Sequence, residues 1–236
     1  MTTPTILYRD AALVAVDKPP GLLVHRTALD SEARDFLLQR LRRLLGQRVY
    51  TVHRLDRPTS GVVVFGLSPG HARVLSASFE QRRVEKRYLA VVRGYTEPTG
   101  RIDYALSDEP HQPLREALTD YQSLARVELP VAVGRYSTSR YSLLAVTPRS
   151  GRYHQIRRHF HHIRHPLIGD TTHGEGRHNR LFRERFGVHR LLLHAVSLGF
   201  PHPASGRWIT VAAPPDAQWQ ALMQALGWPM QTGDEQ

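Results

Sequence analysis

The residues best suited to chemistry lie between His53 and Gly61. A carboxylate, Asp56, stands in a polar turn between Arg54 and Arg57, with apolar stretches on both sides of the turn. Nearby guanidinium groups favour the ionised carboxylate at neutral pH, and small neighbouring residues admit a ligand. Asp56 is therefore a candidate nucleophile or base in a positively charged pocket. The alternative is an aspartate that caps the turn and pairs with an adjacent arginine, which is the commoner use of this residue in loops.

A second segment concentrates arginine and histidine from Gly151 to His159 and continues to Asp170. The pattern indicates a loop that leads into a helix, a setting that favours anions. Metal binding has to be weighed here, because ten of the fourteen histidines lie from His154 onward. His161 and His165 have the i, i+4 spacing of zinc ligands, but no glutamate completes a HExxH motif and no cysteine is present. A polar surface that faces solvent or RNA is the plainer interpretation.

A third segment, Glu85 to Gly94, places Tyr88 at the start of an expected strand beside the basic residues Lys86 and Arg87. A tyrosine ring in such surroundings can stack on a base. An ordinary half-buried strand tyrosine fits the same pattern.

The composition points to a polyanionic partner. Lys and Arg number 32 against 21 Asp and Glu, a net charge of +11, and the only lysines are Lys18 and Lys86. Arginine suits phosphates and base edges, so nucleic acid is the first partner to consider, although a GC-rich genome would also favour arginine. With no cysteine, disulfides, thiol catalysis and the usual cysteine zinc sites are excluded. No membrane span or signal peptide is recognisable, and we expect a soluble, cytoplasmic protein.

The elements that must position these residues alternate irregularly. Hydrophobic patterns predict strands at 13–16, 49–53, 62–65, 87–92, 141–147, 190–196 and 208–211, and helices at 36–45, 69–81, 154–163 and 219–226. Without a regular βαβ alternation, the pattern favours an α+β fold with a mixed, largely antiparallel central sheet and flanking helices. Residues 95–118 are predicted to be a long loop or a hairpin. We expect one catalytic domain over 1–230 and a disordered tail at 231–236.

Taken together, these segments resemble the RluA-type pseudouridine synthases. His53 to Gly61 carries the HRLD-x-x-TSG pattern of that family's catalytic loop. Further matches, in family order, are Asp17 to Gly21 for the KPxG turn, Lys86 to Tyr88 for the aromatic segment, Gly151 to Arg157 with His165 to Asp170 for the third motif, and Leu193 to Ala195 for the last strand. The resemblance implies the pseudouridine synthase catalytic fold, without an S4-type domain.

By this resemblance, the chain isomerises uridine in RNA to pseudouridine without cofactor or metal. Asp56 would be the catalytic carboxylate and Arg157 would pair with it. Tyr88 would stack on the uracil, Ile156 would pack on the other face of the base, and Arg54 would fill the place that the flipped base leaves. The agreement extends to members that act on tRNA, which suggests uridine 65 of the T-stem and a monomeric enzyme. Another tRNA position or ribosomal RNA remains an alternative.

The other residues of the motifs have supporting roles in this interpretation. Lys18, Arg57, Thr59 and Ser60 would shape the pocket and touch the substrate backbone, and Arg158 is the candidate for a phosphate contact. His53 and His194 would hold loops and strands in place. Two other functions are compatible with parts of the sequence: a catalytically silent RNA-binding module and a histidine-dependent metallohydrolase.

Overall fold

The computed structural model describes residues 3–26, 35–108 and 112–229 and divides the chain into two compact units. The first contains the chain up to Lys86 together with Ala195–Ala213, and the second contains Arg87–His194 and the chain from Pro214 onward. Each unit is thus built from two separated stretches, so no linker in the sequence marks the boundary. The tail predicted to be disordered at 231–236 lies outside the described residues.

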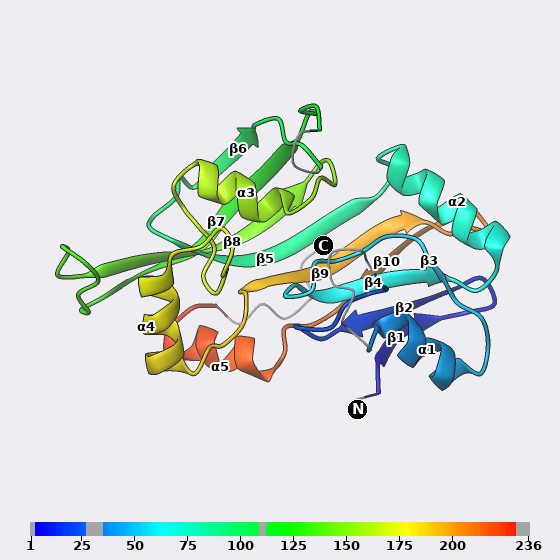
Figure 1. The fold of residues 1–236 in the computed structure, drawn as a ribbon, viewed down its shortest axis with the longest axis horizontal. Coiled ribbons are helices and arrows are strands. Elements are labelled where there is room, and N and C mark those ends of the chain that lie inside the picture. Colours follow the sequence, from blue (N-terminus) through cyan, green and yellow to red (C-terminus); the bar gives the residue numbers. More distant parts are fainter. Residues whose placement is uncertain (1–2, 27–34, 109–111, 230–236) are drawn as a thin grey trace. The chain divides into compact units, whose positions relative to one another are not determined.

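The first unit is a sheet with two helices (Figure 1). Its strands are β1 (Thr5–Arg9), β2 (Leu13–Lys18), β3 (Tyr50–Thr51), β4 (Ser60–Gly66), most of β9 (Leu193–Pro201) and β10 (Trp208–Ala212), and its helices are α1 (Leu37–Leu45) and α2 (Pro69–Glu80). The strand order is β1-β2-β4-β9, with β10 paired to β9 and β3 to β4. The pairs β1–β2, β2–β4, β3–β4 and β9–β10 are antiparallel.

Apolar side chains of β2, β4, β9 and β10 form the core of this unit together with Leu75 of α2. Helix α2 starts where the sequence predicts, because Ser68 accepts a hydrogen bond from the His71 amide at 3.1 Å and Pro69 occupies the first turn. Helix α1 buries Leu37 and Leu41 and ends at the left-handed Gly46. The central strand β4 is buried along its whole length, as expected for a strand between two others.

The second unit is a sheet with three helices. Its strands are β5 (Glu85–Arg93), of which the first two residues belong to the first unit, β6 (Thr99–Asp103), β7 (Leu118–Leu129) and β8 (Ser139–Pro148), and its helices are α3 (Gln155–His162), α4 (Gly176–Phe186) and α5 (Ala217–Ala225). The order is β5-β8-β7-β6, and all three pairs are antiparallel. The α+β fold with a largely antiparallel sheet is therefore confirmed.

Three elements were not predicted from the sequence: β1, β7 and α4. The strand β7 is polar along most of its length and exists because it pairs with β6 on one side and β8 on the other. Helix α4 buries only His178, Leu181 and Phe182. Of the two alternatives for residues 95–118, the hairpin is correct, since β6 pairs with β7 and a bridge joins Leu106 to Arg115.

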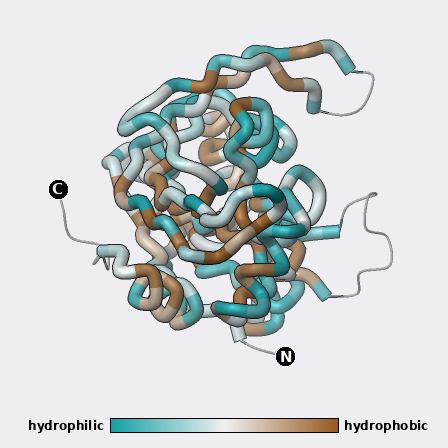
Figure 2. The backbone as a smooth tube through the Cα atoms, turned by 90° about the vertical axis from the view of Figure 1, so that its left-hand side faces the viewer, coloured by the Kyte–Doolittle hydropathy of each residue, from teal (hydrophilic) through white to brown (hydrophobic). Residues whose placement is uncertain are grey.

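Hydrophobic and hydrophilic stretches alternate along the chain in Figure 2. Helix α1 shows the pattern at residue level, with two buried leucines and the exposed Arg42 and Arg43. Within the described ranges, no helix is long and apolar enough to span a membrane.

Gly61, the first glycine of β4, lies close to the backbone of β9, and its substitution tests how tightly these two strands pack. A Cβ at Gly61 would lie 2.2 Å from the carbonyl oxygen of Ala195, at a φ of +111°. We expect Gly61→Ala to lower the free energy of unfolding by about 3 kcal/mol, because backbone must move. Gly46→Ala is the matched control: its φ is +65° but its surroundings are open, so it should cost about 1 kcal/mol. Equal losses in chemical denaturation would contradict this account.

Candidate active site

The loop that carries Asp56 connects β3 to β4 and is held at both ends. Before the carboxylate, the ring of His53 stacks on Phe79 (centroids 4.5 Å apart, 18° between planes) and accepts a hydrogen bond at Nε2 from the Val64 amide at 3.0 Å. After it, the amide of Thr59 donates to the carbonyl of Asp56 at 3.1 Å. The half-buried Asp56 therefore lies in a loop of fixed backbone.

A buried ammonium group joins this loop to the turn after β2. Lys18 is 0 % exposed, and its Nζ donates to the carbonyls of Pro19 (3.0 Å), Leu22 (2.8 Å) and Arg57 (3.1 Å). Gly21 and Arg57 add a reciprocal pair: the Gly21 amide donates to the Arg57 carbonyl at 2.8 Å, and Arg57 Nε donates to the Gly21 carbonyl at 3.1 Å. The side chains of Lys18 and Arg57 therefore fix the part of the loop that directly follows the candidate carboxylate.

Thr59 and Ser60, also predicted in the pocket, are each 2 % exposed. The Thr59 hydroxyl has no hydrogen-bond partner among the described residues. Buried polar atoms are nearly always paired, so a lone hydroxyl three residues from Asp56 is well suited to contact a ligand. Arg54, two residues before the candidate carboxylate, is exposed.

In the second unit, Arg157 of α3 is 3 % exposed and bound by a carboxylate that the sequence analysis did not assign. Its Nε and Nη2 donate to the two oxygens of Asp170 at 2.7 and 2.8 Å. Burial on its own would raise the pKa of Asp170, but hydrogen bonds from Arg157 and from the amides of His173 and Thr172 outweigh it and lower that pKa. The predicted pairing of Arg157 with Asp56 joins residues of different units and stays a prediction.

The start of α3 depends on a second residue that the sequence analysis quoted without a role. The side chain of Gln155 accepts from the Ser150 hydroxyl at 2.7 Å and from the Arg152 amide at 3.0 Å. It donates to the Leu118 carbonyl and to the Thr119 hydroxyl, each at 3.0 Å. Four bonds to a buried amide leave no freedom of rotation, so Gln155 sets the direction of the helix that carries Arg157.

The structure brings Tyr88 and Ile156 together. Tyr88 lies on β5 opposite Val146 of β8 and packs, half-buried, against an apolar cluster that includes Ile156 and Phe160. Ile156 is 6 % exposed at the first turn of α3, directly before Arg157. The aromatic, aliphatic and guanidinium groups expected at a base-binding site thus share one part of the second unit.

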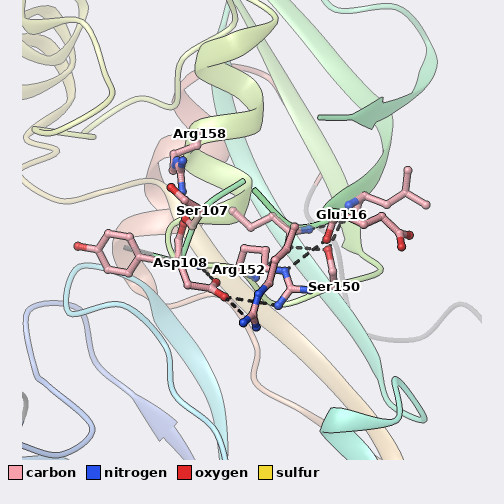
Figure 3. Close-up of polar contacts among 10 residues, drawn as sticks. Ser107, Asp108, Glu116, Ser150, Arg152 and Arg158 are labelled. Carbon is pink, nitrogen blue, oxygen red and sulfur yellow. Dashed lines mark hydrogen bonds and ion pairs between the residues drawn. The ribbon is translucent and has the colours of Figure 1, made fainter. Parts of the chain in front are cut away.

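The segment between β6 and β7 is fastened to the same helix (Figure 3). Arg152 forms an ion pair with Asp108 at 3.5 Å and donates from Nε to the Glu116 carbonyl at 3.3 Å. Arg158 donates from Nη1 to the Ser107 carbonyl at 2.7 Å. The guanidinium predicted to contact phosphate therefore also holds this segment against α3.

The histidines considered for metal are engaged with the backbone. His165 Nδ1 lies 2.8 Å from the Arg93 carbonyl oxygen, and His161 Nδ1 lies 2.7 Å from that of His173. Three grouped His, Asp or Glu side chains that could hold a metal ion do not occur in the part of the chain that the structure describes.

Comparison of the sequence and the fold with known proteins identifies the family. The profile of the RNA pseudouridylate synthase family matches residues 12–162, more than half of the chain. The chain belongs to this family. The match spans the Asp56 loop, Tyr88 and Arg157, so the predicted family is confirmed on the segments that carry the candidate chemistry.

Curated relatives are similar over nearly all of this pseudouridylate synthase. The tRNA pseudouridine synthase C of Yersinia pestis is 50% identical over 236 residues, covering 94% of this chain and 91% of the relative. That of Pectobacterium carotovorum is also 50% identical, but the chain spans only 62% of its length. Human RNA Pseudouridylate Synthase Domain Containing 1 has a similar structure, with a TM-score of 0.72 and 25% identity over 95% of this chain and 94% of the human one.

The neutral His53 gives this pseudouridylate synthase a pH dependence. Burial, with a smaller contribution from the positive charge of Lys86, lowers the pKa of His53 to about 3, whereas an unfolded chain protonates the ring near pH 6.5. Its contribution to stability is therefore lost as pH falls below 6.5, by about 2 kcal/mol at pH 5. We expect His53→Gln, which can still accept from the Val64 amide, to lose correspondingly less stability between pH 7 and pH 5 in urea denaturation.

His189→Gln provides the control, because His189 is exposed and its replacement should leave the pH dependence of the wild type. If His53→Gln loses as much stability on acidification as the wild type, the loop is not held by a neutral imidazole.

Proposed function

We propose that this enzyme isomerises a uridine of tRNA to pseudouridine, at uridine 65 of the T-stem, and that Asp56 is its catalytic carboxylate. The observation that carries the proposal is the placement of Asp56 in a loop clamped by Lys18, Gly21 and Arg57 on one side and by His53 on the other. A carboxylate held in this way can act on the sugar–base junction without first being ordered.

The reaction is an isomerisation and needs no added reagent. The N1–C1′ bond breaks, the uracil turns, C5 bonds to C1′, and the proton lost from C5 balances the proton gained at N1. Because the uracil ring delocalises the negative charge, a carboxylate in a site that excludes water is sufficient. Asp56 would attack the sugar, attack the base or remove a ribose proton, and each route uses the same group.

The remaining residues serve the base and its surroundings. From the family resemblance, we propose that residues 1–230 act as one catalytic domain and that Arg157 is the partner of Asp56 in the reaction. Asp170 holds Nε and Nη2 of the Arg157 guanidinium. Tyr88 and Ile156 would enclose the uracil, and the exposed Arg54 would occupy the vacated stack, since the target must be flipped at a cost of a few kcal/mol. The unpaired Thr59 hydroxyl would contact the flipped nucleotide.

The choice of substrate rests on the relatives. Proteins named tRNA pseudouridine synthase C are about half identical over 94% of this chain, which supports tRNA over ribosomal RNA. We infer a monomer in the cytoplasm from the chain length and the family resemblance.

Removing the carboxylate should abolish turnover. We expect Asp56→Asn to release no tritium from tRNA that carries 5-tritiated uridine, because the amide is neither a nucleophile nor a base, while tRNA binding persists. Asp103→Asn is the matched control, since that carboxylate is exposed on β6. Turnover by Asp56→Asn above background would exclude Asp56 as the catalytic group.

The target can be mapped directly. In RNA from cells that lack this gene, we expect pseudouridine to disappear from position 65 of tRNA and to return when the wild type, but not Asp56→Asn, is supplied. Loss of sites in ribosomal RNA instead would refute the tRNA assignment.

A further inference from the structure

Helix α4 carries arginines that the rest of the second unit does not neutralise. Eight other arginines of this unit form ion pairs with carboxylates: Arg93, Arg101, Arg115, Arg140, Arg149, Arg152, Arg157 and Arg190. Arg177, Arg180 and Arg183 are exposed and have neither an ion pair nor a hydrogen bond within the described ranges. Three unpaired guanidinium groups on one short helix are suited to an anionic partner.

The packing of α4 directs these arginines outward. On the core side, His178 Nδ1 lies 2.7 Å from the Tyr141 hydroxyl of β8, and Phe182 contacts the same ring edge-on at 4.7 Å between centroids. The arginines follow each other at intervals of three residues and so form a row about 9 Å long on the other side of the helix. A row of this length suits successive phosphates of a nucleic acid strand.

An aromatic platform lies next to this row, in the loop between β7 and β8. Tyr136 is 56% exposed, and the guanidinium of Arg135 covers one side of its ring at 5.0 Å while Nη2 donates to its hydroxyl at 2.8 Å. A Cβ at Gly134 would lie 3.2 Å from Nη1 of Arg177, so the loop and the helix are neighbours. A ring held by arginine on one side can stack an unpaired base on the other.

We propose that Arg135, Tyr136, Arg177, Arg180 and Arg183 form a second RNA-binding surface, here called the α4 surface. It would bind phosphates through the helix and an unpaired base through Tyr136. This inference rests on the proposed function, since it takes tRNA as the partner.

The position of the α4 surface indicates which part of the tRNA it binds. Tyr88 lies opposite Val146, whereas α4 packs on Tyr141, five residues and about 17 Å earlier on β8. Arg135 and Tyr136 lie further along, before β8 begins. This separation exceeds the size of one nucleotide, so the α4 surface would contact nucleotides of the tRNA other than the target uridine.

The surface is also mechanically connected to the catalytic arginine. Asn179 of α4 donates to the backbone carbonyl of Asp170 at 2.8 Å and accepts from the Gly169 amide at 2.7 Å. Because the side chain of Asp170 holds Arg157, a tRNA bound to α4 would be in fixed register with that guanidinium.

The test compares full-length tRNA with the isolated T-arm hairpin as substrates. We expect the triple variant R177Q/R180Q/R183Q to lower kcat/KM for full-length tRNA about ten- to hundred-fold through KM, and to flatten the slope of log affinity against log salt by about 2. The comparison with the hairpin locates the contact: a smaller loss on the hairpin would place it outside the T-arm, and an equal loss would place it within the T-arm. The pair R101Q/R149Q is the matched control, since both arginines are exposed but paired with Asp120.

The platform is tested separately. Tyr136→Ala should weaken binding of full-length tRNA about tenfold, while Tyr136→Phe, which keeps the ring and loses the hydroxyl, should bind like the wild type. Wild-type affinity and an unchanged salt slope in the triple variant would overturn the proposal. Failure of the proposed function would appear differently, as a wild type that does not modify tRNA.

Discussion

The hydrogen bonds of the Lys18 ammonium group hold the loop of the candidate catalytic carboxylate in place. A buried ammonium group is stable only when its N–H donors are hydrogen-bonded. Here the acceptors are three carbonyls, two from the turn after β2 and one from the loop before β4. One of those carbonyls belongs to Arg57, next to Asp56, so the turn after β2 and the loop before β4 cannot move independently. The strands on either side, β2 and β4, are themselves paired, which makes the clamp an extension of the sheet.

In the second unit a buried carboxylate, that of Asp170, holds a candidate site residue in place. Asp170 binds both nitrogens of the Arg157 fork and two backbone amides, and Gln155 fixes the first turn of the helix that carries the arginine. In both units a buried charged group is held by several hydrogen bonds and lies next to a candidate site residue. Such networks are specific because a partly satisfied member would be costly. The arginine predicted at the active site is therefore oriented before substrate arrives.

Local patterns in the sequence predicted much of this. The apolar run from Val62 to Phe65, the stop at Gly46 and the proline after Ser68 act within a few residues. Strand β4 and helices α1 and α2 lie where these patterns place them. The pattern from His53 to Gly61 also predicted the family, which the profile match over residues 12–162 confirms. What could not be predicted depends on distant partners: β7 needs β6 and β8, and Asp170 shows its role only beside Arg157. If Arg157 is expected to be buried, it needs a carboxylate partner, and this requirement was the one signal in the sequence that pointed to a residue such as Asp170.

The return of residues 195–213 to the first unit has a consequence for synthesis on the ribosome. Strand β4 is complete once Gly66 has emerged, yet its neighbour β9 follows roughly 130 residues later. Until then the nascent sheet has an open edge beside its most apolar strand, which is the kind of edge that invites mispairing. The candidate catalytic loop therefore precedes a strand whose final partner is among the last to be translated, so this strand is fully paired only near the end of synthesis.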